Sequence, residues 1–188
     1  RYSEAIDYSD KAEQKALAIN DTIERLSAHA NKGSILLRQG LCQESVDMLV
    51  SLWEQVRKVN YNILTLKYLS PLLSAYLRLD KTDSVALYMP YADEACKGLP
   101  PTTIGVLGIL EIKADMLARQ RKYAEEKQLL DSMGNLSNIN MAMPQGKYLA
   151  LRAECLNNLG QHAEAYKVMR NAYEHSDSLK QSDIDRQL

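Results

Sequence analysis

The residue types that usually perform catalysis or bind metals are sparse and scattered in this chain of 188 residues. The three histidines are His29, His162 and His175, and the three cysteines are Cys42, Cys96 and Cys155. No two cysteines form the CxxC pair of a structural zinc site, and their wide spacing argues against a disulfide framework. The chain contains no glycine-rich phosphate loop, no HExxH and no GxSxG motif. The sequence therefore predicts a non-enzymatic protein with no metal site and no cofactor.

Charge and hydropathy narrow the classes of partner. The 23 Lys and Arg residues balance 24 Asp and Glu residues, which gives a net charge of −1, and neither sign is pooled in one block. We therefore do not expect this segment to bind nucleic acid through electrostatic attraction. Every apolar run is far shorter than the ~18 residues needed to cross a bilayer, so we expect no membrane span in this segment. A peptide, a protein or a small ligand remains as the partner.

Apolar residues recur through most of the chain at the i, i+3, i+4 and i+7 positions typical of amphipathic helices. One such stripe surrounds Gly40 and contains Leu36, Leu37, Leu41, Val46, Leu49, Val50, Leu52 and Trp53. No segment alternates apolar and polar residues for long, and no Asn-Gly or Asp-Gly hairpin turn is present. The predicted fold class is all-α.

The helical pattern repeats with a period of about 40 residues. The turns between paired helices fall at Gly40, Asp80, Arg121 and Gly160, separated by 40, 41 and 39 residues. Four residues before these turns stand Leu36, Tyr76, Leu117 and Leu156, and seven residues before them stand Gly33, Leu73, Ala114 and Ala153. Nine residues after them stand Leu49, Met89, Leu130 and Met169, and twelve after stand Leu52, Ala92, Met133 and Ala172. We expect the later positions to form a buried stripe on each second helix, and the small residues to allow close helix contact.

Arginines share one position in three of these repeats. Arg38, Arg78 and Arg119 each lie two residues before a turn. They can form a ladder that binds a carboxylate or phosphate ligand through bidentate contacts. Alternatively, each is simply a cation in the last turn of a helix, where the helix dipole favours positive charge without any ligand.

Caps and prolines mark the predicted helix boundaries. Asp21 is placed to cap a helix that runs to about Arg38, and Thr82 with Asp83 is placed to do the same after the second turn. Pro71 and Pro90 fall inside predicted helices, where proline removes a hydrogen bond and introduces a kink. We therefore expect the second repeat to be bent or displaced.

The pattern around the third and fourth turns resembles the tetratricopeptide repeat, a helix-turn-helix unit usually of 34 residues. RAECLNNLGQHAEAYKVMRNAY (152–173) matches it best, with His162 and Ala165 in packing positions. The third repeat departs from the family at Glu126, where alanine is usual, and Cys42 occupies the position of His162 in the first repeat, where we expect it to be buried. The resemblance implies a TPR-like helical-hairpin solenoid of about four repeats, an α-α superhelix over residues 1–175, whose helices are about one turn longer than the family norm.

The same resemblance implies a groove lined by first helices, which holds a peptide, a protein partner or a small ligand. The family's groove positions correspond here to Lys67, Ser70, Ser74, Glu111, Asp115, Lys147, Glu154 and Asn157. Glu111 and Asp115 are four residues apart on one helix face. They can bind a basic peptide or form a solvated edge.

The two ends of the chain fit the same register. Tyr2, Ala5, Ser9 and Ala12 fall in second-helix positions, so the chain is expected to start in mid-repeat. We therefore expect the first helix to have an apolar face without a partner in this chain. A homodimer is one arrangement that would bury this face. Residues 176–188 are predicted to begin a C-terminal connector helix.

This organisation is similar to the sensor region of membrane-bound signalling proteins of Bacteroidetes, in which such repeats precede a histidine kinase or a helix-turn-helix output domain. The resemblance implies a role in two-component signal transduction and a periplasmic or otherwise extracytoplasmic location. The alternative is a free-standing cytoplasmic scaffold that binds a partner peptide.

Overall fold

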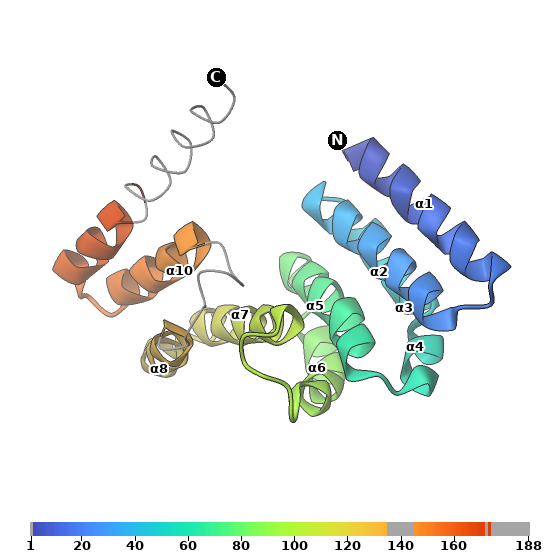
Figure 1. Cartoon of the computed structure of the whole chain (residues 1–188). Coiled ribbons are helices and arrows are strands. Elements are labelled where there is room, and N and C mark those ends of the chain that lie inside the picture. The colour runs from blue at the N-terminus through green and yellow to red at the C-terminus, as the bar shows by residue number, and fades with distance from the viewer. Residues whose placement is uncertain (1, 135–144, 172, 174–188) are drawn as a thin grey trace, which may run out of the picture. The chain divides into compact units, whose positions relative to one another are not determined.

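The computed structural model describes residues 2–134, 145–171 and 173, and this part of the chain is helical without any strand (Figure 1). The helices are α1 (Tyr2–Ala18), α2 (Thr22–Arg38), α3 (Cys42–Ser51), α4 (Trp53–Val59), α5 (Asn62–Arg78), α6 (Thr82–Cys96), α7 (Ile104–Arg119), α8 (Tyr123–Gly134) and α10 (Gln145–Asn158), followed by a helix over 162–171. The protein is all-α, as predicted. The chain divides into two compact units, Arg1–Leu99 and Pro100–Leu188.

The four predicted turns are confirmed as left-handed helix ends. Gly40 and Gly160 have φ of 85° and 74°, and Asp80 and Arg121 both have φ of 58°. In each case the next residue donates its backbone N–H to the carbonyl five residues earlier, as Leu41 does to Leu36 at 3.0 Å and Gln161 does to Leu156 at 2.9 Å. This is the Schellman motif, which satisfies carbonyls that the end of a helix leaves free. The turn spacing therefore reflects a recurring backbone geometry.

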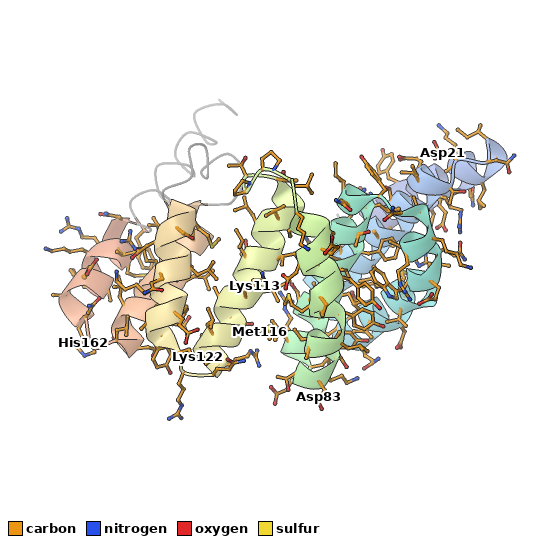
Figure 2. All side chains as sticks on the ribbon, turned by 90° about the horizontal axis from the view of Figure 1, so that it is seen from below. Asp21, Asp83, Lys113, Met116, Lys122 and His162 are labelled. Carbon is orange, nitrogen blue, oxygen red and sulfur yellow. The ribbon has the colours of Figure 1, made fainter. Side chains whose placement is uncertain are left out.

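Two further left-handed turns, which were not predicted in detail, lie 20 residues before Gly40 and Asp80. Asn20 and Asn60 have φ of 57° and 51°. Asparagine tolerates this conformation better than most residues because its short side chain hydrogen-bonds locally. Asp21 follows directly and caps α2, accepting the backbone N–H of Glu24 at 2.9 Å, as predicted; Figure 2 marks it at the chain turn. The prediction for Thr82 was wrong, because Lys81 is the N-cap of α6 and makes no side-chain cap.

In the first unit, α2 lies between α1 and α5, and α3 packs against both α2 and α5. Apolar side chains of α5, most of them fully buried, form the centre of the core, and side chains of α2, α3, α4 and α6 complete it. Gly33 permits the close contact between α2 and α3, since an added Cβ would lie 2.6 Å from the side chain of Leu49. The expected role of a small residue seven positions before the turn is confirmed here.

The second helix of the first hairpin differs from the prediction. It breaks at Leu52, which has φ of −112° and ψ of 6° and separates α3 from α4. Leu41 and Val50, predicted on the apolar stripe, are 39% and 38% exposed, and Met169 is also exposed. Leu49, Ala92, Leu130 and Met133 are buried as predicted, whereas Leu52 and Met89 are only half-buried and Ala172 lies outside the described residues.

The prediction of an unpartnered apolar face on α1 was wrong. Ser9, in the middle of that face, is buried, and α1 packs against α2. Ala5 and Ala12 are half-buried beside it. This face is therefore the contact with α2, because one stripe of small side chains suffices to bring two helices together.

Both prolines lie inside helices that continue past them. Pro71 lies in α5 and Pro90 in α6, and these two helices pack against each other. Pro71 is buried, so its ring contributes to the core.

In the second unit, α8 packs against α7 and α10. Its core contains Leu107, Ala114, Leu130, Met133, Tyr148 and Cys155. Tyr148 donates its hydroxyl hydrogen to the carbonyl of Leu130 at 2.9 Å, and its oxygen lies so close to Gly134 that a Cβ there would be 2.2 Å away. Ala153 is buried in a neighbouring cluster, as its repeat position predicts. The predicted connector over 176–188 lies outside the described residues.

Candidate functional site

The groove residues predicted on the second repeat form a single stripe on α5. Lys67, Ser70 and Ser74 are half-buried, and Arg78 completes the line at the exposed end of the helix. Their spacing of three or four residues keeps them on one helix face. Nearly all the residues between them are buried, because α5 contacts α2, α3, α4 and α6. This stripe is therefore where α5 presents polar groups to solvent.

Neighbouring α2 carries an equivalent stripe that sequence reasoning missed. Ser27 and Ser34 are half-buried, and Asn31 is exposed between them. Ser27 and Ser34 lie 40 residues before Lys67 and Ser74, so the repeat spacing already held the signal. The α2 stripe was missed because serine and asparagine side chains do not form a distinctive pattern along a helix.

The arginine positions have different local partners. Nη1 of Arg78 donates to the backbone carbonyl of Leu37 in the last turn of α2 at 3.0 Å. Arg119 pairs through Nε with Asp115 on its own helix at 3.1 Å. Arg38 ends α2 and is exposed. Arg38 and Arg78 belong to the first unit and Arg119 to the second. Arg78 donates to the end of the neighbouring helix α2 and not to its own helix, which is a contact that neither sequence interpretation described.

The remaining predicted residues lie on α7 and α10 in the second unit. Glu111 and Asp115 are half-buried on α7, whereas Glu154 and Asn157 are exposed on α10. The Asn157 side chain contacts Nδ1 of His162 at 2.8 Å, and Figure 2 labels His162 at the adjoining turn. His162 is exposed, so it is an edge residue. Lys147 falls in the first turn of α10, and its side chain lies outside the described part of the structure.

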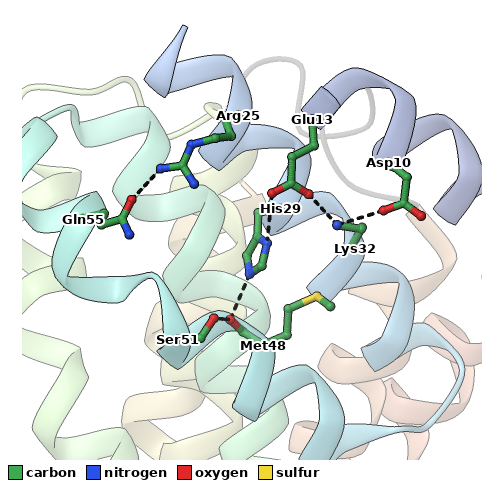
Figure 3. A network of polar contacts seen from close by, with 8 residues as sticks. All are labelled: Asp10, Glu13, Arg25, His29, Lys32, Met48, Ser51 and Gln55. Atoms are coloured by element: carbon green, nitrogen blue, oxygen red, sulfur yellow. Dashed lines mark hydrogen bonds and ion pairs between the residues drawn. The ribbon is translucent and has the colours of Figure 1, made fainter. Parts of the chain in front are cut away.

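A polar network links α1, α2 and α3, and no single sequence motif signals it (Figure 3). Nζ of Lys32 contacts Asp10 at 2.9 Å and Glu13 at 2.5 Å. Glu13 also faces Nδ1 of His29 at 3.7 Å. Burial lowers the pKa of Lys32, but hydrogen bonds to Glu13 and Asp10 outweigh it and raise the pKa above its usual value. Lys32 therefore stays charged and holds the two carboxylates of α1.

The orientation of His29 follows from its second nitrogen. Nε2 lies 3.0 Å from the carbonyl oxygen of Met48, and a carbonyl only accepts, so Nε2 carries the hydrogen. The His29 ring also stacks on Tyr68 of α5, with centroids 6.4 Å apart. The network thus joins four helices, although Nδ1 of His29 and the Tyr68 hydroxyl are buried without a hydrogen-bond partner in the described part of the chain.

Cys155 has the features of an unreactive thiol. Cys155 is buried, and burial with the neighbouring Glu126 carboxylate raises its pKa to about 12, so the thiol remains protonated near neutral pH. Its Sγ contacts the carbonyl of Tyr123 at 3.4 Å. Cys42 and Cys96 are half-buried, so the expectation that Cys42 is buried was only partly met, and none of the three cysteines forms a disulfide within the described residues.

Glu126 itself is buried at the α8 position where the sequence pattern departs from the family. It is 3% exposed, and Oε2 has no hydrogen-bond partner in the described part of the chain. Burial raises its pKa above the usual value, and the hydrogen bond with Cys155 only partly offsets that effect. The carboxyl group is therefore a source of pH-dependent stability.

Among the described residues, no three His, Cys, Asp or Glu side chains gather as metal ligands. Within the same residues, no helix combines the length and apolar character that a membrane span requires. No protein-family model matches the chain significantly, and neither does any curated protein or solved structure. The chain is therefore defined by its own geometry as an all-α protein made of helical hairpins.

Proposed function

We propose that the protein is a non-enzymatic, TPR-like recognition module that binds an extended peptide or a partner segment along the polar stripes of α2 and α5. The observation that carries this proposal is the stripe on α5, whose polar side chains are partly exposed along a helix that is mostly buried beyond its first turn. Helical-hairpin arrays commonly use such first-helix faces to bind partners.

The chemistry of the two stripes favours an acidic segment. The residues involved are Ser27, Asn31, Ser34, Arg38, Lys67, Ser70, Ser74 and Arg78. The charged members, Arg38, Lys67 and Arg78, are all cations, and the others carry hydroxyl or amide groups. Cations bind carboxylates, and hydroxyls and amides hydrogen-bond to a peptide backbone.

The similarity to Bacteroidetes sensor regions supports placing this module in a two-component signalling protein, on the extracytoplasmic side of the membrane. In that role, the bound partner must favour one of two packing arrangements of the hairpins, because only a difference in affinity shifts an equilibrium. A free-standing cytoplasmic scaffold is the competing proposal. An apolar segment of about 20 residues encoded shortly after Leu188 supports the sensor, and further repeats there support the scaffold.

The binding proposal is tested by selecting peptides from a random display library on the full chain and measuring their affinities. We expect acidic sequences to be enriched. Lys67→Glu should weaken their binding by about tenfold or more, since it replaces an attraction by a repulsion. Lys167→Glu, on an exposed face of the helix over 162–171, is the matched control. Equal losses in both variants, or enrichment of basic peptides, would contradict the proposal.

A further inference from the structure

A second candidate site lies apart from the polar stripes, where α4 meets α5 and α6. A hollow of about 230 Å³ opens there, lined by residues that include Trp53, Arg57, Asn62, Thr65 and Tyr91. Its position coincides with the break at Leu52 and with the left-handed turn at Asn60. Local departures from a regular repeat are where functional sites are expected.

The aromatic wall of this hollow is held in place from several sides. Trp53 is buried and contacts Tyr88 and Tyr91 edge-on, with centroids 5.7 Å and 5.5 Å away. The guanidinium of Arg57 lies 5.0 Å from the Tyr91 ring centroid and pairs with Glu54 at 2.9 Å. Because both members of this ion pair are exposed, the pair orients Arg57 only weakly, and the contacts among the three aromatic rings shape this side of the hollow.

The remaining lining of the hollow offers neutral hydrogen-bonding groups. The side chains of Asn60, Asn62 and Thr65 have no hydrogen-bond partner in the described part of the chain. Two amides and one hydroxyl both donate and accept hydrogen bonds. Glu94 at the rim pairs with Lys97 at 2.6 Å, as Arg57 does with Glu54, so the charges around the hollow are matched.

We infer that this hollow binds one neutral saccharide unit. A sugar ring has a C–H face that packs on an aromatic side chain and an edge of hydroxyls that both donate and accept. The hollow combines aromatic side chains with neutral groups of the same dual character, and its volume of about 230 Å³ has room for a single ring. A purely apolar peptide side chain would leave the amides without partners on burial, which is unfavourable. This site is independent of the peptide-binding proposal.

The test uses the single tryptophan of the chain as a built-in reporter. The indole N–H resonance of Trp53 in the full chain is followed while the methyl glycosides of glucose, galactose, mannose and N-acetylglucosamine are added in turn. We expect a saturable shift with at least one of them. The double variant Asn62→Ala with Thr65→Val should weaken that binding by about tenfold. Its amide spectrum should remain that of the folded protein.

Asn158→Ala, at an exposed position of α10, is the matched control and should bind as the parent chain does. The inference is overturned if none of the four sugars shifts the Trp53 resonance. It is also overturned if the shift persists unchanged in the double variant, or if the library-selected acidic peptides occupy the hollow and produce the same shift. Loss of peptide binding in Lys67→Glu with sugar binding intact would separate the two sites.

Discussion

Arg78 reaches across one full repeat to hydrogen-bond the backbone carbonyl of Leu37, with an Nη1–O distance of 3.0 Å. The carbonyls in the last turn of a helix lack partners within that helix. The Leu37 carbonyl also accepts the backbone N–H of Gly40 at 3.1 Å, so the guanidinium occupies its second acceptor site. The hairpin of α5 and α6 is thereby fastened to the hairpin of α2 and α3 at the end where both turn.

Arg78→Ala should destabilise the first unit modestly. The variant removes a charge-assisted hydrogen bond at the helix end, and because the side chain is exposed we expect a loss of about 0.5–1 kcal/mol. Chemical denaturation monitored by Trp53 fluorescence reports on this unit. Arg38→Ala is the control, since Arg38 has no partner in the described part of the chain. An equal effect of both substitutions would mean that the bond to Leu37 contributes nothing specific.

Gly33→Ala should lower stability although alanine is the better helix former. The new Cβ would lie 2.6 Å from buried Leu49, and such overpacking costs about 1–3 kcal/mol, against about 1 kcal/mol gained in helix propensity. Asn31→Ala, on the exposed side of α2, also raises the helix propensity but places no atom against Leu49. It should therefore be neutral or stabilising. The thermal midpoints of the two variants should therefore move in opposite directions. A stabilised Gly33→Ala would show that α2 and α3 are farther apart than described.

Lys32→Met should loosen α1 from α2. The ammonium is largely buried between Asp10 and Glu13, so its removal leaves two carboxylates without their cation, at a cost of about 1–3 kcal/mol. Combining it with Glu13→Gln should cost less than the sum of the two single changes, because the pair is lost only once. Strictly additive unfolding energies in this double-mutant cycle would argue against the contact.

The pH dependence of the second unit should be dominated by Glu126. Burial, and to a smaller degree the carboxylates of Glu154 and Asp115, raises the pKa of this group in the folded chain, so the folded state binds its proton more tightly than the unfolded state. The stabilising contribution is complete below the ordinary glutamate pKa. It declines as pH rises toward the raised value and is absent above it.

Glu126→Gln should flatten this decline, because the amide does not titrate. Glu125→Gln is the matched control at the exposed neighbouring position and should retain the slope of the parent chain. Denaturation curves collected at several pH values across the acid range measure how the free energy of unfolding depends on pH. A parental slope in Glu126→Gln would assign the pH dependence to other groups.

The features that could be predicted from the sequence were those that depend on local backbone geometry and on the spacing of apolar residues. Gly40 and Gly160 mark left-handed helix ends because glycine adopts them without strain, and the apolar spacing then located the equivalent turns at Asp80 and Arg121. Buried positions such as Leu49 and Met133 followed from the helical period.

The features that sequence reasoning missed depend on contacts between distant segments. The break at Leu52 has no proline or glycine to announce it, and the contact of Glu13 with Lys32 joins residues 19 apart that no motif connects. The aromatic contacts of Trp53 arise from the redirection of α4 after that break. Such groupings are set by packing, so spacing alone does not reveal them.

The most direct test of the recognition role is to map a selected acidic peptide on the ¹⁵N-labelled full chain by amide chemical-shift perturbation. We predict that the perturbed residues concentrate at 27–38 on α2 and 67–78 on α5, on the sides that carry the polar stripes. Chemical-shift perturbations confined to α3 and α6, with α2 and α5 unchanged, would contradict the proposed recognition role of these two stripes.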